Sequence, residues 1–279
     1  MSERVLIAGC GDLGQRAARL LQARGDEVYA LRRHPPTQDG SSLHWLHADL
    51  TRPETLQNLP ADITQLVYAP TPGAREEAAY RAIFVDGLRN MLDALVGKSL
   101  RRVLLVSSSA VYGEHHDGWV DENTPPAPLG FNGDVLLEAE HWLASQPIRS
   151  TVLRLAGLYG PGRTQVIERV RAGLACAPRG SAHWTNRIHI DDAAEAIAHL
   201  LHLSEPQGLY LGVDDTPLPL DVLYDSLAAL VGSPAVPEGP APASIGSKRL
   251  SNARLRASGF RVRWPDSRAG YADLWATQK

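Results

Sequence analysis

Short apolar runs alternate along this chain of 279 residues with longer segments whose apolar residues recur at helical spacing. The runs predict buried strands at 5–8, 27–31, 43–48, 64–69, 102–106, 151–155, 187–190 and 209–213. The longer segments predict a helix that begins near residue 13 and further helices over 76–95, 133–144, 165–173, 191–202 and 220–231. Because strands and helices alternate, we predict the α/β fold class: a Rossmann-like, doubly wound parallel sheet with a small C-terminal substrate lobe.

The first strand is followed by a glycine cluster, Gly9-Cys10-Gly11-Asp12-Leu13-Gly14, which opens the first helix. In a strand–helix–strand unit, Gly9 permits a tight turn, Gly11 lets the backbone approach a pyrophosphate, and Gly14 lets the helix pack close to the strand. The helix N-terminus offers free N–H groups to phosphate. An ordinary glycine-rich turn is the alternative, but the flanking strands favour a dinucleotide site that includes Asp12 and Leu13.

The end of the second strand carries Arg32 and Arg33. An enzyme that uses NAD places an acid there to accept the ribose hydroxyls, whereas an arginine suits the 2′-phosphate of NADP. No acid stands at positions 31–33. We therefore predict NADP as the cofactor, with NAD as a possible substitute and two solvated loop arginines as the alternative interpretation.

Three further strand ends add candidate cofactor residues. Asp49-Leu50 follows the third strand, and the acid could accept the adenine amino group or cap the helix that starts near Pro53. Ala69-Pro70 follows the fourth strand, and Ser107 closes the fifth. Open α/β sheets bind ligands at the carboxyl ends of their strands, so we include all five of these residues in the cofactor site.

Composition excludes several classes of protein. The formal net charge of −3 gives no reason to expect nucleic acid or an anionic membrane as partner. Cys10 and Cys176 are the only cysteines, which argues against a disulfide framework. His44 and His47 have no acid or cysteine at ligand spacing, so we predict no metal site. With no apolar run of 18 residues and no leader pattern, a cytoplasmic protein is expected.

Several motifs resemble the extended short-chain dehydrogenase/reductase family, which includes the NAD(P)-dependent epimerases and dehydratases of nucleotide sugars. In chain order they are Gly9 to Gly14, Asp49-Leu50, Ser107 to Gly113, Glu122 to Pro126, Arg154 to Gly162 and His189 to Ala196. The resemblance covers nearly the whole length. The glycine order GxGxxG, where the family usually has GxxGxxG, and the stretch from Ser251 to Pro265 are similar to an atypical subgroup.

The resemblance implies catalysis by a Tyr-x-x-x-Lys pair and a serine, and Ser108 matches the serine. The pair itself is missing. If Glu140 matches the family's downstream glutamate, the pair positions hold Asn132 and Leu136; if Glu138 does, they hold Gly130 and Asp134. Lysine occurs only at Lys98, Lys248 and Lys279, and no Tyr-x-x-x-Lys exists. The groups near this region that could move protons are Asp134, His115, His116 and Tyr112, and spacing singles out none of them.

These observations lead to two functional hypotheses. The first is an NADP(H)-binding oxidoreductase or epimerase that acts on a small molecule, such as a nucleotide sugar, with low activity on standard substrates. The second is a non-catalytic NADP-binding sensor or regulatory protein. In either case we predict an NAD(P)-binding domain over 1–157, completed by about 187–206, a substrate-binding lobe over 158–279, and a monomer or homodimer.

Overall fold

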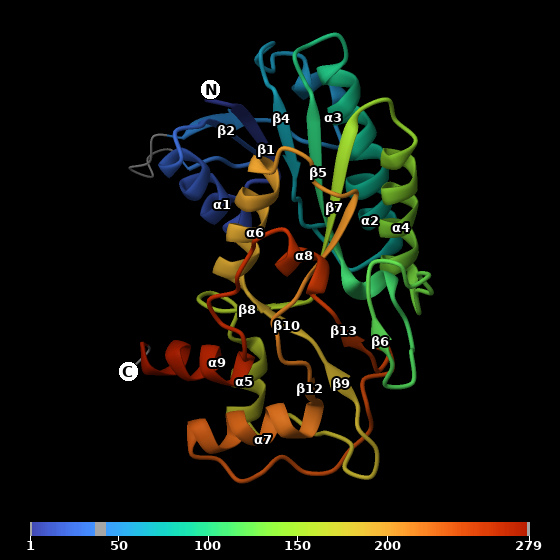
Figure 1. The fold of residues 1–279 in the computed structure, drawn as a ribbon, viewed down its shortest axis with the longest axis vertical. Coiled ribbons are helices and arrows are strands. Elements are labelled where there is room, and N and C mark those ends of the chain that lie inside the picture. Colours follow the sequence, from blue (N-terminus) through green and yellow to red (C-terminus); the bar gives the residue numbers. More distant parts are fainter. Residues whose placement is uncertain (1, 37–42, 278–279) are drawn as a thin grey trace. The chain divides into compact units, whose positions relative to one another are not determined.

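The computed structural model describes residues 2–36 and 43–277. The chain divides into two compact units, shown in Figure 1. The first unit comprises Met1–Ser108, Phe131–Leu153 and Ala194–Leu209, and the second comprises Ser109–Gly130, Arg154–Ala193 and Tyr210–Lys279. The predicted functional boundary near residue 157 stays a prediction.

The central sheet has seven strands in the order β11-β7-β5-β4-β1-β2-β3. Their bounds are β1 Arg4–Ala8, β2 Glu27–Arg32, β3 His44–His47, β4 Gln65–Tyr68, β5 Arg102–Ser108, β7 Arg149–Leu155 and β11 Leu209–Gly212. Each pair among the neighbours β3, β2, β1, β4 and β5 is parallel. Val5, Leu6 and Ile7 are fully buried because both faces of the sheet are covered, and such strands consist of continuous apolar runs. The predicted α/β, doubly wound fold is confirmed.

The strand order reverses direction at β1. The chain passes from β1 to β2 on one side, and β4 later pairs with β1 on the other side. Such a reversal is the switch point where open α/β sheets leave a crevice at the carboxyl ends of their strands. The predicted glycine turn therefore follows β1, the strand at which the strand order reverses.

Helices cover both faces of the sheet in the first unit. They are α1 Asp12–Ala23, α2 Glu77–Arg81, α3 Gly87–Leu95, α4 Phe131–Ala144 and the part of α6 (Ile190–His202) from Ala194 onward. Figure 1 shows α1 and this part of α6 on one side, with α2, α3 and α4 on the other. Within the described residues, no helix is long and apolar enough to cross a membrane.

The helix predicted over 76–95 is interrupted by a π-helical turn, Ala82–Asp86, between α2 and α3. The hydroxyl of Tyr68, at the end of β4, donates to the Ile83 carbonyl at 2.6 Å and so satisfies a group that the π turn frees. A Cβ at Gly87 would lie 2.8 Å from the same hydroxyl, so glycine makes room for it. One buried tyrosine thus explains the departure from a regular helix.

The described part of the second unit is built mainly from short strand pairs and short helices. β8 Gly157–Tyr159 pairs with β10 Arg187–His189, β6 Trp119–Val120 with β13 Arg249–Leu250, and β9 Trp184–Thr185 with β12 Leu218–Pro219. The helices are α5 Gln165–Arg171, α7 Leu220–Val231, α8 Ala253–Ala257 and α9 Ser267–Ala276. α5, α7 and α9 enclose an apolar core around Tyr159, Leu223 and Tyr271.

We expect Tyr68→Phe to lower the free energy of unfolding by about 1–3 kcal/mol, because it leaves the Ile83 carbonyl without its donor. Urea unfolding measures the change. Tyr29→Phe is the matched control, since its hydroxyl bonds to the accessible Glu27 and its loss should cost under about 1 kcal/mol. Equal effects of the two substitutions would contradict this account of the π turn.

The stability of the protein should also depend on Asp214, which is 1% exposed. Burial raises the pKa of its carboxyl to about 8, although the N–H groups of Thr216 and Ser267 oppose the shift. Between about pH 4 and pH 8 the folded chain holds a proton that the unfolded chain has released, so the free energy of unfolding falls as pH rises. Asp214→Asn should flatten this fall in urea titrations at several pH values; an unchanged pH profile would contradict it.

Candidate functional site

The turn after β1 is built around Gly9, whose φ is +81°. The N–H groups of Gly9 and Cys10 both donate to the Leu31 carbonyl, at 3.0 and 2.9 Å, which ties the turn to the end of β2. A Cβ at Gly9 would stand 2.4 Å from the Cα of Pro70. Both the backbone conformation and the contact with the loop after β4 therefore require glycine.

The other two glycines meet different surroundings. A Cβ on Gly14 would approach the Ile7 side chain to 3.1 Å, so glycine allows α1 to pack closely on β1. A Cβ on Gly11 would meet no protein atom nearer than the Gly9 carbonyl at 4.0 Å. The backbone at Gly11, immediately before α1, is thus open to approach by another molecule, and pyrophosphate binding there stays a prediction.

Beside this turn lies a cavity of about 200 Å³ within the first unit. Residues from the predicted cofactor set contribute much of its lining: Gly9, Gly11, Arg32, Arg33, Asp49, Leu50 and Pro70. Leu31, His34, Ala48, Thr71 and Ile83 complete it and were not predicted. Four of these five adjoin a predicted residue in the sequence, so their position at the end of a strand could have identified them. Ile83 gave none, because its place depends on the π turn.

The charges around the cavity are well defined. Burial alone would raise the pKa of the Asp49 carboxyl, but the N–H and hydroxyl of Thr51 and the charges of Arg33 and Arg52 hold that pKa below its usual value. Asp49 is therefore ionised at neutral pH. Among the described residues, no carboxylate forms an ion pair with Arg32 or Arg33, so both guanidinium groups are available to an anion.

The alternative role of Asp49 as a helix cap is wrong. Its carboxylate accepts from the N–H and the hydroxyl of Thr51, at 3.0 and 2.8 Å. The short 3₁₀ turn Pro53–Leu56 begins after Arg52 and receives no side-chain cap. The carboxylate instead stabilises the tight bend that carries Asp49 and Leu50 to the cavity.

Three further predicted cofactor residues do not line the cavity but lie within two residues of one that does. Asp12 and Leu13 form the first turn of α1, where Asp12 accepts from Arg16 at 2.9 Å and Leu13 is 8% exposed. The N–H of Ala69 donates to the Ala8 carbonyl at 2.9 Å, which holds the end of β4 against β1. These contacts give the three residues structural roles in the described chain, and their contact with a cofactor stays a prediction.

β5 ends in the two serines that the sequence singled out. The Ser107 hydroxyl donates to the Glu140 carboxylate of α4 at 2.5 Å, and both side chains are 5% exposed. Glu138 points elsewhere and pairs with Arg81 at 2.7 Å. Ser108 follows half-buried at the end of the strand.

The contact between Ser107 and Glu140 favours one of the two predicted registers for the missing pair. Asn132, Leu136 and Glu140 are four residues apart and share one face of α4. Gly130 lies outside the helix, and Asp134 is exposed. We therefore place the family's tyrosine and lysine positions at Asn132 and Leu136, an assignment that stays a prediction.

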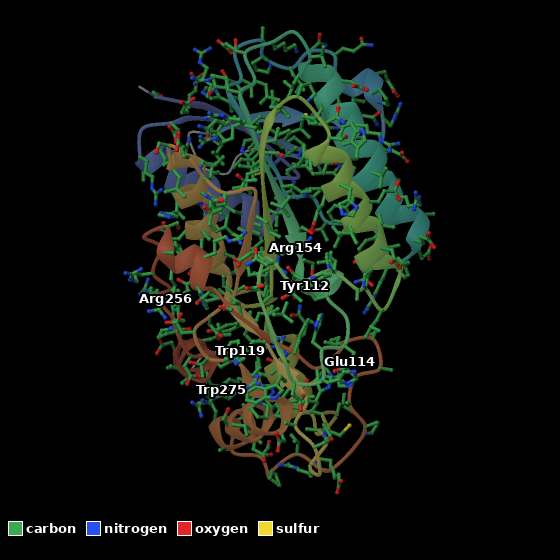
Figure 2. All side chains as sticks on the ribbon, turned by 45° about the vertical axis from the view of Figure 1, so that its right-hand side comes forward. Tyr112, Glu114, Trp119, Arg154, Arg256 and Trp275 are labelled. Atoms are coloured by element: carbon green, nitrogen blue, oxygen red, sulfur yellow. The ribbon has the colours of Figure 1, made fainter. Side chains whose placement is uncertain are left out.

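The other proton-moving candidates lie in the second unit. Tyr112 is buried, and its hydroxyl accepts from Arg154 at 2.6 Å and donates to the Asp121 carbonyl at 3.1 Å; Figure 2 labels Tyr112 and Arg154. Its hydroxyl is thus committed to the fold. His116 is almost fully exposed. Burial and the charge of Lys248 lower the pKa of His115, so its imidazole is neutral at pH 7.

Comparison with known proteins decides the family. The model of the NAD dependent epimerase/dehydratase family matches residues 5–210. The chain belongs to this family. Protein YeeZ of Escherichia coli K12 is 32% identical over 239 residues, which cover 82% of this chain and 84% of YeeZ. A 3-diazoavenalumate denitrifying reductase from Streptomyces is 28% identical and covers 91% and 92% of the two chains.

Solved structures agree with this assignment. A protein from Methylobacillus flagellatus, assigned to the NAD-dependent epimerases/dehydratases, is 42% identical, with a TM-score of 0.84 over 100% of this chain and 99% of its own. MoeE5 in complex with UDP-glucuronic acid and NAD shares the fold, with a TM-score of 0.80, 22% identity and coverage of 99% of both chains. The predicted family resemblance is confirmed, whereas the atypical subgroup stays a prediction.

We expect Gly9→Ala to destabilise the protein more than Gly25→Ala. Both positions have positive φ, but a Cβ at Gly25 meets no atom within 4 Å, whereas a Cβ at Gly9 collides with Pro70. The difference in unfolding free energy should be about 1–3 kcal/mol, the usual cost of overpacking. Thermal and urea unfolding of the two variants measure it, and equal losses would refute the role of this contact.

Proposed function

We propose that the protein binds NADP(H) in the cavity beside the glycine turn and acts as an oxidoreductase or epimerase on a nucleotide-sugar-like substrate. The observation that carries the proposal is an open backbone at Gly11 beside two guanidinium groups, Arg32 and Arg33, that line the same cavity and form no ion pair with a carboxylate of the described residues. When bound, the cofactor supplies a nicotinamide that accepts or donates hydride.

The residues at the end of β2 support the choice of NADP over NAD. The hydroxyls of an NAD ribose need an acceptor there, and positions 31–33 are Leu, Arg and Arg. A planar guanidinium donates two parallel hydrogen bonds to a phosphate and remains charged at all physiological pH values. Arg32 and Arg33 would therefore hold the 2′-phosphate, while the ionised Asp49 would accept from the adenine amino group.

The substrate class rests on similarity and on the β5 terminus. MoeE5, which shares the fold, forms a complex with UDP-glucuronic acid, and a relative of 28% identity is a reductase. In this chain Ser108 ends β5, where a ligand oxygen could accept its hydroxyl hydrogen. Ser108 would position the substrate, in a protein that works as a monomer or homodimer.

The acid/base part of the usual mechanism is missing from α4. An amide such as that of Asn132 cannot accept a proton at neutral pH, and Leu136 carries no charge to lower the pKa of a neighbouring group. This observation also favours the second hypothesis, a non-catalytic NADP-binding regulator. The two are separated by hydride transfer. Reduction of NADP⁺ by a sugar nucleotide, with deuterium passing from the labelled sugar carbon to the nicotinamide and the sugar hydroxyl becoming a carbonyl, supports the enzyme. A fully inert complex supports the regulator.

Cofactor preference is the first test. The wild type should bind NADPH more tightly than NADH by roughly 10- to 100-fold, since a guanidinium–phosphate contact contributes about 1.5–3 kcal/mol. Arg32→Ala/Arg33→Ala should remove the difference while leaving NADH affinity nearly unchanged. Isothermal titration calorimetry of both cofactors measures this, with Arg101→Ala, an exposed arginine away from the cavity lining, as the control. Equal affinities of the wild type for NADPH and NADH would contradict the proposal for NADP.

Turnover is the second test. Wild-type activity on common epimerase and dehydratase substrates should be about 10²- to 10⁴-fold below that of an enzyme with the full pair, because one general acid/base is missing. Ser108→Ala should change this residual rate little. In the background of Asn132→Tyr/Leu136→Lys, where a phenol is restored, Ser108→Ala should lower it clearly. Rapid turnover of a common nucleotide sugar by the wild type is the contrary result.

A further inference from the structure

The second unit contains a larger cavity, of about 530 Å³, far in sequence from the glycine turn. Its lining includes the aromatic side chain of Trp119, the carboxyl groups of Asp214 and Asp215, the amide of Asn252 and the guanidinium groups of Arg256 and Arg261. Neither the proposed cofactor nor the proposed reaction uses any of them. The volume lies within the range of small-molecule sites, about 300–1,000 Å³.

Trp119 gives the cavity an exposed aromatic wall. Its side chain is 59% exposed, although it lies on β6, which is paired in register with β13. The Arg249 guanidinium lies 5.1 Å from the Trp119 ring and 4.9 Å from the Trp184 ring, and its Nε donates to the Asp117 carbonyl at 2.8 Å. The Trp119 indole is therefore held in place by its neighbours while it remains in contact with water. Covering it with a flat aromatic ring is favourable, because it removes apolar surface from water.

The same cavity carries two guanidinium groups. Arg261 is fixed by hydrogen bonds to the carbonyls of Arg256 and Phe260, at 3.1 and 2.8 Å. Arg256 is half exposed, and its Nη1 lies 3.5 Å from the Asp215 carboxylate. Figure 2 labels Arg256 and Trp119, which line this one cavity. Each guanidinium keeps N–H groups for a further anion, since each has five donors.

The acidic residues of the cavity do not cancel these charges. Asn252, itself 8% exposed, donates to the Asp215 carboxylate at 2.7 Å and thereby fixes it near Arg256. Asp214 is fully buried, and burial raises the pKa of its carboxyl to about 8, so it is mostly neutral at pH 7. One charged carboxylate thus faces two guanidinium groups, and the cavity retains a net positive charge.

We propose that this cavity binds a small molecule that combines a flat aromatic ring with a phosphate or carboxylate group. The ring stacks on Trp119, and the anionic group binds Arg256 and Arg261. A ring without charge would leave the guanidinium groups unused, and an anion without a ring would leave the indole exposed. The proposal is independent of cofactor binding in the first unit.

Phenyl phosphate is the direct probe, because it carries both features and lacks the adenosine expected in the dinucleotide cavity. Calorimetry with the full chain should show one site, with inorganic phosphate and phenol each at least about tenfold weaker. Uridine monophosphate and 4-hydroxycinnamate, tested next, distinguish a nucleotide from a free aromatic acid as the source of this chemistry. No binding of phenyl phosphate at 10 mM, on the order of the weakest specific ligands, would overturn the proposal.

Variants separate this site from non-specific binding. Trp119→Ala and Arg256→Ala/Arg261→Ala should each weaken phenyl phosphate at least about tenfold, whereas Trp119→Phe keeps the ring and should stay within about threefold. Arg171→Ala removes an exposed arginine of the same unit and should change nothing, as should Arg32→Ala/Arg33→Ala. Circular dichroism confirms folding of each variant. Equal binding by wild type and Arg256→Ala/Arg261→Ala would contradict the assignment.

Discussion

The close approach of the turn after β1 to Pro70 is the constraint on which the first unit depends. Because Gly9 has no side chain, the backbone can cross from β1 to α1 while it remains hydrogen-bonded to the end of β2 and packed against the loop after β4. β2 and β4 flank β1, and the cavity opens where the segments that follow these strands diverge. A bulkier residue would move the loop and alter the lining on both sides.

A second contact, from Ser107 to Glu140, positions α4 against β5. It turns one face of the helix toward the sheet, and on this face stand an amide and a leucine rather than a phenol and an amine. The fold of the epimerase/dehydratase family is thus retained, whereas the proposed dyad positions, Asn132 and Leu136, hold residue types that cannot carry out the family's usual proton transfer. On this proposal, cofactor binding and turnover are separable properties.

The sequence predicted most of the fold because β1 and β4, buried on both faces, are unbroken apolar runs, and because helices of ordinary length separate them. It predicted the cavity residues that follow strands, since the carboxyl ends of parallel strands meet at one edge. It missed Ile83, whose position depends on a hydroxyl from Tyr68, fifteen residues earlier in the chain. It also missed the cavity of the second unit, because Trp119 meets Arg249 only through a pairing of two short, distant strands.

The central claim is that the turn at Gly9–Gly14 and the end of β2 form the cofactor site. Hydrogen–deuterium exchange of the full chain with and without NADPH tests it most directly. The amides of Asp12 and Leu13 lie in the first turn of α1, directly after Gly11, so a phosphate bound at this helix N-terminus should slow their exchange. We predict slowing in peptides that cover 9–14, 32–34 and 48–50. Unchanged exchange in these peptides at saturating NADPH would contradict the account.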